Sequence, residues 1–188
     1  MTKSFNSLLG LKKGIFLAGT STRSPVFGLR PTFAYERGKN EVPHRAYGHT
    51  KEGDAWKETD QSPTSAVLGD GGIYSSLDDL AKWDRALREH RPLTAAEMGP
   101  ALTPVQPTSG QASDEHGVTV SYGFGWFLNP YRGHRRMSHD GSTIGFRTTI
   151  QRFPDDKLTV IVLANRADLD PEELALKVAD LYLSPPGK

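Results

Sequence analysis

The sequence predicts an α+β fold: an antiparallel β-sheet backed by a C-terminal helix and preceded by a loop-rich helical segment. The hydrophobic period is two after residue 118, which is typical of half-buried strands. Pro154-Asp155-Asp156 supplies turn chemistry between two later apolar runs. Asp170-Pro171 is a strong helix start, with a capping residue followed by proline at the first helical position. Together these patterns place the sheet and its helix in the second half of the chain.

Composition limits the class of protein. With 188 residues, of which 36% are hydrophobic, the chain suits one globular core, and its net charge of +1 gives no general attraction to nucleic acid or anionic membranes. No cysteine is present, so disulfides and thiolate metal sites are excluded. No window has the length and apolarity of a membrane span, and the first residues lack the apolar core of a signal peptide. We therefore expect a soluble protein of unknown compartment, without nucleic-acid or membrane partners.

The first half is less informative. Residues 1–33 form a poorly defined N-terminal segment, in which four apolar residues hint at a short amphipathic helix. Residues 34–73 predict a long structured loop that packs over another part of the molecule. Ser76 and Asp79 match a capping box ahead of one helix, and Thr94 and Glu97 match it again for a shorter helix that ends near Gly99-Pro100.

The second half should contain four strands and the last helix. We predict strands at about residues 118–128, 134–139, 146–153 and 158–164. The last of these is apolar on both faces, which favours a central, covered strand. The helix that follows should turn Leu174, Val178 and Leu181 toward the sheet.

Five segments in series resemble one known family. They are Arg45-Ala46-Tyr47-Gly48, Gly69 to Trp83, Tyr122-Gly123-Phe124-Gly125-Trp126, His139-Asp140-Gly141 with Gly145-Phe146, and Ile161 to Arg166. In this order they resemble the serine β-lactamase-like superfamily, in particular its class C β-lactamase, DD-peptidase and esterase branch. The resemblance covers residues 40–183 and implies that residues 34–184 are the C-terminal part of such a domain, an incomplete β-lactamase/transpeptidase-like fold.

The resemblance implies a role for the strand around His139. Members of the family use a Ser-x-x-Lys nucleophile, a Tyr-x-Asn relay and a third motif, Lys-Thr-Gly or His-x-Gly, on a strand that lines the site. His139-Asp140-Gly141 matches the third motif. His139 would then contribute charge and hydrogen bonding, Gly141 would let substrate approach the strand, and the backbone N–H of Ser142 would be half of an oxyanion hole.

The other two motifs are missing. No serine of the chain is followed three positions later by lysine, no Tyr-x-Asn occurs, and no Gly-x-Ser-x-Gly elbow is present. We therefore assign no nucleophile, no cofactor and no metal, and expect a truncated serine hydrolase that is inactive as an isolated chain. Ile15 to Gly19 would be the remainder of the stretch that precedes the aligned part in the family.

Simpler interpretations stand beside these. His139 could be an ordinary strand-end histidine and Asp140 a turn residue. His44, His49, His134 and His139 could suggest a metal cluster, but they show no ligand spacing. Aromatic residues at 122, 124 and 126 favour core packing, and Asp70-Gly71-Gly72 favours tight packing ahead of a helix over phosphate binding.

Three functions remain open from the sequence. The chain could be a hydrolase remnant that still binds acyl or peptide-like small molecules. It could be a fragment that completes a hydrolase in trans, since the family resemblance implies that residues 158–164 keep an open, apolar sheet edge able to self-associate or capture a partner strand. It could also be a non-catalytic interaction module.

Overall fold

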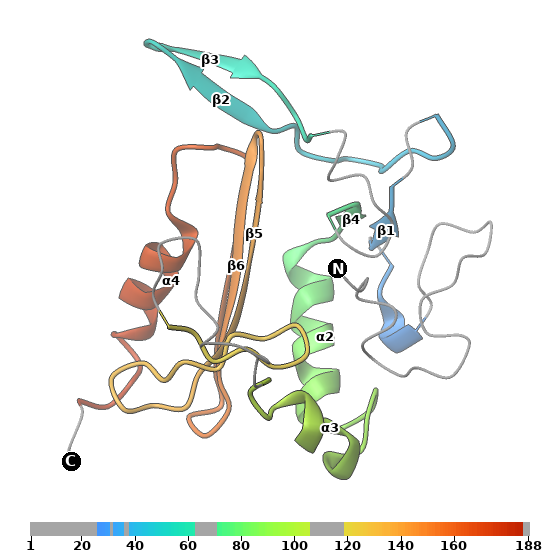
Figure 1. The fold of residues 1–188 in the computed structure, drawn as a ribbon. Coiled ribbons are helices and arrows are strands. Elements are labelled where there is room, and N and C mark those ends of the chain that lie inside the picture. Colours follow the sequence, from blue (N-terminus) through green and yellow to red (C-terminus); the bar gives the residue numbers. More distant parts are fainter. Residues whose placement is uncertain (1–25, 31, 36–37, 63–70, 106–118, 186–188) are drawn as a thin grey trace.

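The computed structural model describes residues 26–30, 32–35, 38–62, 71–105 and 119–185. A three-stranded sheet stands at the centre, with α4 on one side and α2 on the other (Figure 1). The elements in chain order are η1 (Val26–Gly28), β1 (Phe33–Ala34), β2 (His49–Glu52), β3 (Ala55–Glu58), β4 (Ile73–Tyr74), α2 (Leu77–Arg88), α3 (Ala95–Ala101), β5 (Met137–Thr143), β6 (Phe146–Phe153), β7 (Leu158–Ala164) and α4 (Pro171–Ala179). Across these described residues, no helix is both long and apolar enough to cross a bilayer.

The central sheet is antiparallel, with strand order β5-β6-β7. β5 and β6 form a hairpin that closes where Thr143 pairs with Phe146, and β6 pairs with β7 from Phe153↔Leu158 to Arg147↔Ala164. The predicted bounds of β6 and β7 are confirmed. β5 begins three residues later than predicted and runs on to Thr143. β7 is an edge strand among the described residues, so the prediction that it is central is wrong there; β6 takes that place.

Helix α4 covers one face of the sheet and builds the apolar core. Asp170 caps it by accepting from the Glu173 N–H at 2.9 Å, as predicted. Ala175 and Ala179 are fully buried against Phe153. The prediction that Leu174 and Leu181 face the sheet is wrong, because they are 41% and 80% exposed. The small alanines, one helical turn apart, let the helix axis approach the sheet closely.

Helix α2 lies on the other face. The Ser76 hydroxyl accepts from the Asp79 N–H at 3.3 Å, but the box is not reciprocal, because the buried Asp79 carboxylate instead contacts Thr32 Oγ1 at 2.8 Å and Lys82 Nζ at 2.9 Å. Farther along the helix, Asp84 Oδ1 accepts from Arg152 Nε at 2.7 Å and from Thr159 Oγ1 at 2.9 Å. A buried ion pair thus joins α2 to β6, and a hydrogen bond joins it to β7.

Helix α3 has the predicted capping box. Thr94 N–H donates to Glu97 Oε2 at 2.9 Å, and Glu97 N–H donates back to Thr94 Oγ1 at 3.3 Å. The helix runs through Pro100 to Ala101, slightly beyond the predicted end. The Ala101 carbonyl then accepts from the Phe124 N–H at 2.9 Å, which ties the helix end to the following aromatic segment.

Residues 38–62 are more regular than the predicted loop. They contain the antiparallel hairpin β2–β3, whose strands join through Gly53 and Asp54, with φ +61° at Gly53. Glycine in the first position of a two-residue connection suits tight hairpin turns. The hairpin extends away from the body, above the end of the central sheet (Figure 1).

The predicted strand at 118–128 is wrong for its described part. The chain reverses there: Gly123 N–H donates to the Trp126 carbonyl at 2.8 Å, and Gly125 has φ +77°. Tyr122 then pairs with Phe127, and Phe127 pairs with Ser138 of β5, as isolated bridges. Apolar residues at every second position favoured a strand in the sequence, but the glycines between them here permit a turn. The hint of a helix near residues 5–11 and the segment Ile15–Gly19 lie outside the described residues.

Candidate active-site strand

Strand β5 presents the predicted site residues along the edge that faces away from β6. Ser138 exchanges two backbone hydrogen bonds of 2.9 Å with Phe127, so its backbone points away from β6. The direction of backbone bonding alternates along an antiparallel strand. The N–H groups of Asp140 and Ser142 therefore also point out of the sheet edge, while His139 and Gly141 bond to β6.

The two faces of β5 hold different side chains. Side chains alternate between faces, so His139 and Gly141 share the face that carries Arg152 and α2, whereas Asp140 and Ser142 share the α4 face. His139 is half-buried and Ser142 is exposed. The histidine thus points into the space between the sheet and the helical part. The outward N–H of Ser142 lies three residues farther along the strand.

Gly141 is required by its neighbour on β6. A Cβ at this position would meet Thr148 Oγ1 at 2.5 Å, well inside contact distance. The Thr148 hydroxyl instead donates to the Gly141 carbonyl at 3.4 Å. The threonine therefore occupies the space that a side chain at residue 141 would need.

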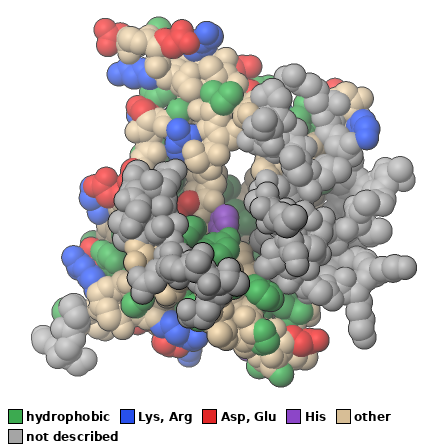
Figure 2. Space-filling view, viewed as in Figure 1, with side chains coloured by type: hydrophobic (Ala, Val, Ile, Leu, Met, Phe, Trp, Pro, Cys, Tyr) green, Lys and Arg blue, Asp and Glu red, His purple; other side chains and the backbone are tan. Residues whose placement is uncertain are grey.

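Two aromatic rings hold the His139 imidazole. The Tyr122 hydroxyl lies 3.3 Å from His139 Nε2. The Phe127 ring centroid is 6.1 Å from the imidazole, and the Tyr122 and Phe127 rings meet edge to face at 4.8 Å. In the space-filling view, hydrophobic side chains and a histidine side chain are visible at the hollowed centre of the surface (Figure 2).

Asp140 lies within β5 and not in a turn. Its Oδ1 atom is buried and has no hydrogen-bond partner among the described residues. The neighbouring buried polar groups are already paired, because Gln151 Nε2 donates to Thr149 Oγ1 at 2.8 Å. A buried carboxylate oxygen without a donor is costly. Asp140 Oδ1 can therefore still accept a hydrogen bond from a partner.

The β5–β6 turn is joined to the overlying segment by two glycines. A Cβ on Gly145 would meet the Gly48 carbonyl carbon at 2.4 Å, and a Cβ on Gly48 would meet Gly145 Cα at 2.8 Å. His49 N–H donates to the Gly145 carbonyl at 3.2 Å, and Gly145 N–H donates to the Asp60 carbonyl at 2.8 Å. Two backbones thus touch directly where the hairpin ends.

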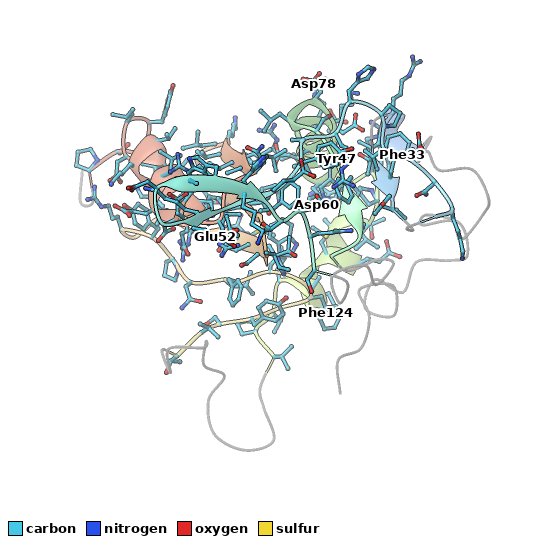
Figure 3. All side chains as sticks on the ribbon, turned by 90° about the horizontal axis from the view of Figure 1, so that it is seen from above. Phe33, Tyr47, Glu52, Asp60, Asp78 and Phe124 are labelled. Atoms are coloured by element: carbon cyan, nitrogen blue, oxygen red, sulfur yellow. The ribbon has the colours of Figure 1, made fainter. Side chains whose placement is uncertain are left out.

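Arg45 organises the segment that lies over this junction. Its guanidinium lies over the rings of Tyr47 at 4.6 Å and Tyr74 at 4.7 Å, and forms an ion pair with Asp60. Figure 3 shows Tyr47 and Asp60 on this segment, viewed from above the sheet. Burial raises the pKa of Tyr74 to about 12, so its hydroxyl stays protonated. Asn165 Nδ2 donates to the Tyr47 carbonyl at 2.9 Å and brings the end of β7 to the same place.

No group of three His, Asp or Glu side chains among the described residues is arranged to hold a metal ion. His49 Nδ1 bonds to the Tyr47 carbonyl at 2.8 Å. His134 bonds to Asp156 and to the Ser184 carbonyl on the far side of the sheet. The histidines that the sequence offers as a cluster therefore have separate local partners.

Comparison with known proteins connects these segments. The family model named Beta-lactamase matches residues 25–183. The chain belongs to the beta-lactamase family. It is 31% identical over 172 residues to penicillin-binding protein 4* of Bacillus subtilis, a match that covers 83% of the chain and 36% of that relative. It is 29% identical over 116 residues to D-aminopeptidase of Brucella anthropi, which covers 62% of the chain and 21% of that protein.

Solved structures of the beta-lactamase family show the same fold at lower identity. A penicillin binding protein from Bacillus halodurans superimposes with a TM-score of 0.65 at 20% identity, covering 83% of the chain and 46% of that structure. A class C beta-lactamase gives a TM-score of 0.57 at 19% identity, covering 85% of the chain and 49% of its own. The chain thus spans about a third of the first curated relative and about half of these structures.

Within this beta-lactamase family chain, the structure places His139, Gly141 and Ser142 along one strand, and their catalytic roles stay a prediction. Sequence reasoning missed Tyr122, which it assigned to the core. The alternation of residues 120–128 suggested a straight strand, whereas the reversal at Gly123–Trp126 brings Tyr122 to His139. Paired glycines around an aromatic residue were the signal of that turn.

Proposed function

We propose that this chain forms the third-motif wall of an acyl-transfer site of the serine β-lactamase, penicillin-binding protein and esterase type. In this site His139 contributes hydrogen bonding to substrate, Gly141 lets the substrate approach, and the Ser142 N–H stabilises the developing oxyanion. Acyl or peptide-like small molecules are the ligand class. The nucleophilic serine and its lysine come from polypeptide outside these 188 residues.

The observation behind this proposal is the edge of β5 from Asp140 to Ser142, which has no strand partner among the described residues. It combines an outward Ser142 N–H, an exposed glycine that carries no side chain, and an imidazole on the face toward α2. An extended acyl substrate could add along such an edge through main-chain hydrogen bonds.

We infer that the isolated chain is inactive. Ser-x-x-Lys is absent from the sequence, so the covalent route has no nucleophile with a base one helical turn away. Removing the nucleophile and base from a serine hydrolase leaves a small remnant of the rate, due to the oxyanion hole and binding. The geometry of β5 can supply only that remnant.

The first test is turnover of a chromogenic cephalosporin and of a p-nitrophenyl ester by the purified chain. We expect no hydrolysis that a serine-directed acylating agent abolishes. Hydrolysis that disappears after such an agent would contradict the inference of inactivity, because it would require an activated serine within the chain.

The second test adds the missing part. Co-expression with a Ser-x-x-Lys-containing fragment of a related protein should produce a complex in which a labelled acylating agent modifies the added serine. His139→Asn should reduce this acylation, whereas His90→Asn should not, because His90 lies exposed at the end of α2. Equal acylation in both variants would remove His139 from the site.

A second candidate function is partner capture through β7. The backbone bonds to β6 alternate along this strand, so every second residue, including Ile161 and Leu163, directs its N–H and C=O away from the described sheet. β7 carries no charge, and Leu163 is 39% exposed. Edge strands of this kind favour association. We propose that a strand from a complementing polypeptide, or from a second copy, pairs here.

Light scattering tests this second proposal. The wild-type chain should form dimers or larger species, and Leu163→Lys should shift it toward monomer, because charge on an edge strand opposes strand addition. Leu181→Lys serves as the control, since Leu181 is exposed beyond α4 and away from the strand. A wild-type chain that stays monomeric, alone and with the complementing fragment, would contradict the proposal.

A further inference from the structure

We propose that Tyr122 is a positioning residue: its hydroxyl donates to His139 Nε2 and holds the imidazole as the Nδ1–H tautomer, with the ring fixed beside the β5 edge. The inference rests on the proposed acyl-transfer role of that edge. It gives a role at this site to a residue that the sequence pattern assigned to the core.

The backbone brings Tyr122 to His139 by successive pairing. The turn closed by Gly123 N–H and the Trp126 carbonyl sets Tyr122 opposite Phe127. Phe127 in turn pairs with Ser138, the residue before His139, through two 2.9 Å hydrogen bonds. The position of the phenol relative to the imidazole is therefore set by main-chain hydrogen bonds and not by the side chains alone.

The end of helix α3 contacts this turn and holds it in place. A Cβ on the buried Gly123 would meet the Ala101 carbonyl oxygen at 2.2 Å, and Phe124 N–H donates to the same oxygen at 2.9 Å. The end of helix α3 thus fixes the turn that carries Tyr122. A residue placed by a helix end, a turn and a strand is well suited to orient a neighbour.

In this arrangement the phenol is the donor of the hydrogen bond. Burial raises the pKa of the Tyr122 phenol, so at neutral pH the group retains its proton and can donate it. The described residues place the Tyr122 oxygen 3.3 Å from Nε2, and no other hydrogen bond of this hydroxyl is present among them. A donating phenol requires an unprotonated Nε2, which in neutral imidazole puts the proton on Nδ1.

This arrangement defines which nitrogen of His139 remains available. With Nε2 occupied by the phenol, Nδ1–H is the donor that can reach a substrate or relay group. The edge-to-face contact of Tyr122 with Phe127 at 4.8 Å, and the tilted contact of Phe127 with the imidazole at 6.1 Å, limit rotation of the ring. Tyr122 therefore acts through His139 and need not touch substrate.

The test is the tautomer of His139 in the full chain, read from imidazole ¹⁵N shifts at neutral pH. In the wild type, Nδ1 should be the protonated nitrogen. Tyr122→Phe removes only the hydroxyl and should abolish this preference. It should also raise several-fold the rate at which diethyl pyrocarbonate modifies His139, measured by peptide mass spectrometry, because Nε2 becomes free.

Tyr131→Phe is the matched control. It removes a different hydroxyl, which donates to Asp180 Oδ1 at 3.0 Å, and should leave the His139 signals and modification rate unchanged. A wild-type His139 protonated on Nε2 would overturn the proposal without any variant, as would an unchanged tautomer in folded Tyr122→Phe. The tautomer requires no acyl transfer, so failure of the complementation experiment would count against the proposed function and not against this hydrogen bond.

Discussion

Two regions of the molecule hold together in different ways. The sheet and α4 share a continuous apolar core, in which Phe153, Ala175 and Ala179 are fully buried. The region on the other face, with α2 and the segment around residues 38–62, is joined to the sheet by a few specific contacts. These include the Asp84–Arg152 ion pair and the Gly48–Gly145 backbone contact.

The apolar core mainly stabilises the fold, whereas the specific contacts mainly position one region against the other. Apolar burial is non-directional and tolerates small shifts, whereas an ion pair or a backbone contact fixes one geometry. His139 lies on the face where the specific contacts are found. The second region is therefore positioned precisely at modest gain in stability, beside the strand that carries the candidate site.

The largest expected effect comes from breaking the apolar core. Phe153→Ala should lower the free energy of unfolding by about 4 kcal/mol, since it leaves a cavity under α4. Chemical denaturation monitored by circular dichroism measures the change. Leu174→Ala on the same helix is the control and should cost little, because Leu174 is 41% exposed. Comparable losses would mean that α4 faces the sheet as the sequence first suggested.

Removing the buried ion pair should come next. Asp84→Ala leaves the Arg152 side chain, only 5% exposed, without its counter-charge and should cost about 3 kcal/mol. Glu173→Ala breaks an exposed pair with Lys177 and should leave the unfolding midpoint unchanged. If Asp84→Ala behaves like Glu173→Ala, the ion pair does not hold α2 to the sheet.

The glycine junction tests the second region more selectively. Gly145→Ala forces a Cβ against the Gly48 backbone and should cost about 2 kcal/mol, with the largest rise in amide exchange at residues 48–60. Ile144→Ala alters the same turn without adding atoms and should behave as wild type. Uniform exchange changes over the whole chain would argue against a local junction.

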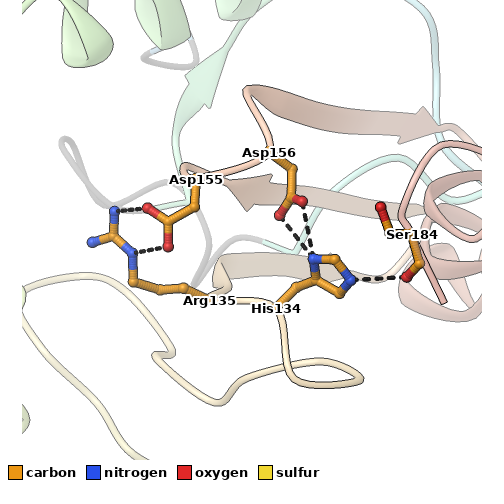
Figure 4. Close-up of polar contacts among 5 residues, drawn as sticks. All are labelled: His134, Arg135, Asp155, Asp156 and Ser184. Carbon is orange, nitrogen blue, oxygen red and sulfur yellow. Dashed lines mark hydrogen bonds and ion pairs between the residues drawn. The ribbon is translucent and has the colours of Figure 1, made fainter. Parts of the chain in front are cut away.

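The smallest expected effect is a pH dependence of stability that involves neither the ion pair nor the glycine contact. His134 Nδ1 lies 3.0 Å from Asp156 Oδ2, and Nε2 lies 3.1 Å from the Ser184 carbonyl (Figure 4). Both partners only accept, so hydrogen bonding to Ser184 and then to Asp156 raises the His134 pKa above its ordinary 6.5. The added stability is full below about pH 6.5 and is lost as pH rises through the higher folded pKa.

His134→Gln tests that dependence. The wild-type denaturation midpoint should decline as pH rises above about 6.5, and the variant should flatten this decline. His90→Asn should keep the wild-type slope, because no hydrogen bond of the His90 ring is found among the described residues. An identical slope in wild type and His134→Gln would show that the C-terminal segment is not held by the imidazolium.

Local signals were enough for the sheet and its helix. The end of β6, the start of β7 and the start of α4 lie where their turn and capping residues predict. Pro154 and Pro171 restrict the backbone by themselves, and the Asp170 side chain caps the helix. On α4, Val178 packs against the core as predicted, whereas Leu174 and Leu181 were mispredicted, since a preference for leucine over alanine ignored how closely a helix can pack.

The remaining elements depend on distant residues. The β2–β3 hairpin is charged and exposed, so hydrophobic periodicity carries no signal for it. The turn at Gly123 depends on the Ala101 carbonyl, and the Tyr122–His139 contact depends on that turn. The motif strand was found by resemblance, whereas its aromatic support required the tertiary structure.

The contact between Gly48 and Gly145 restricts how this architecture can diversify. Neither position has room for a single methyl group, so the β5–β6 turn and the segment facing it can change in sequence only as a matched pair. New ligand preferences would have to arise in loops elsewhere around the strand, while this corner remains the same.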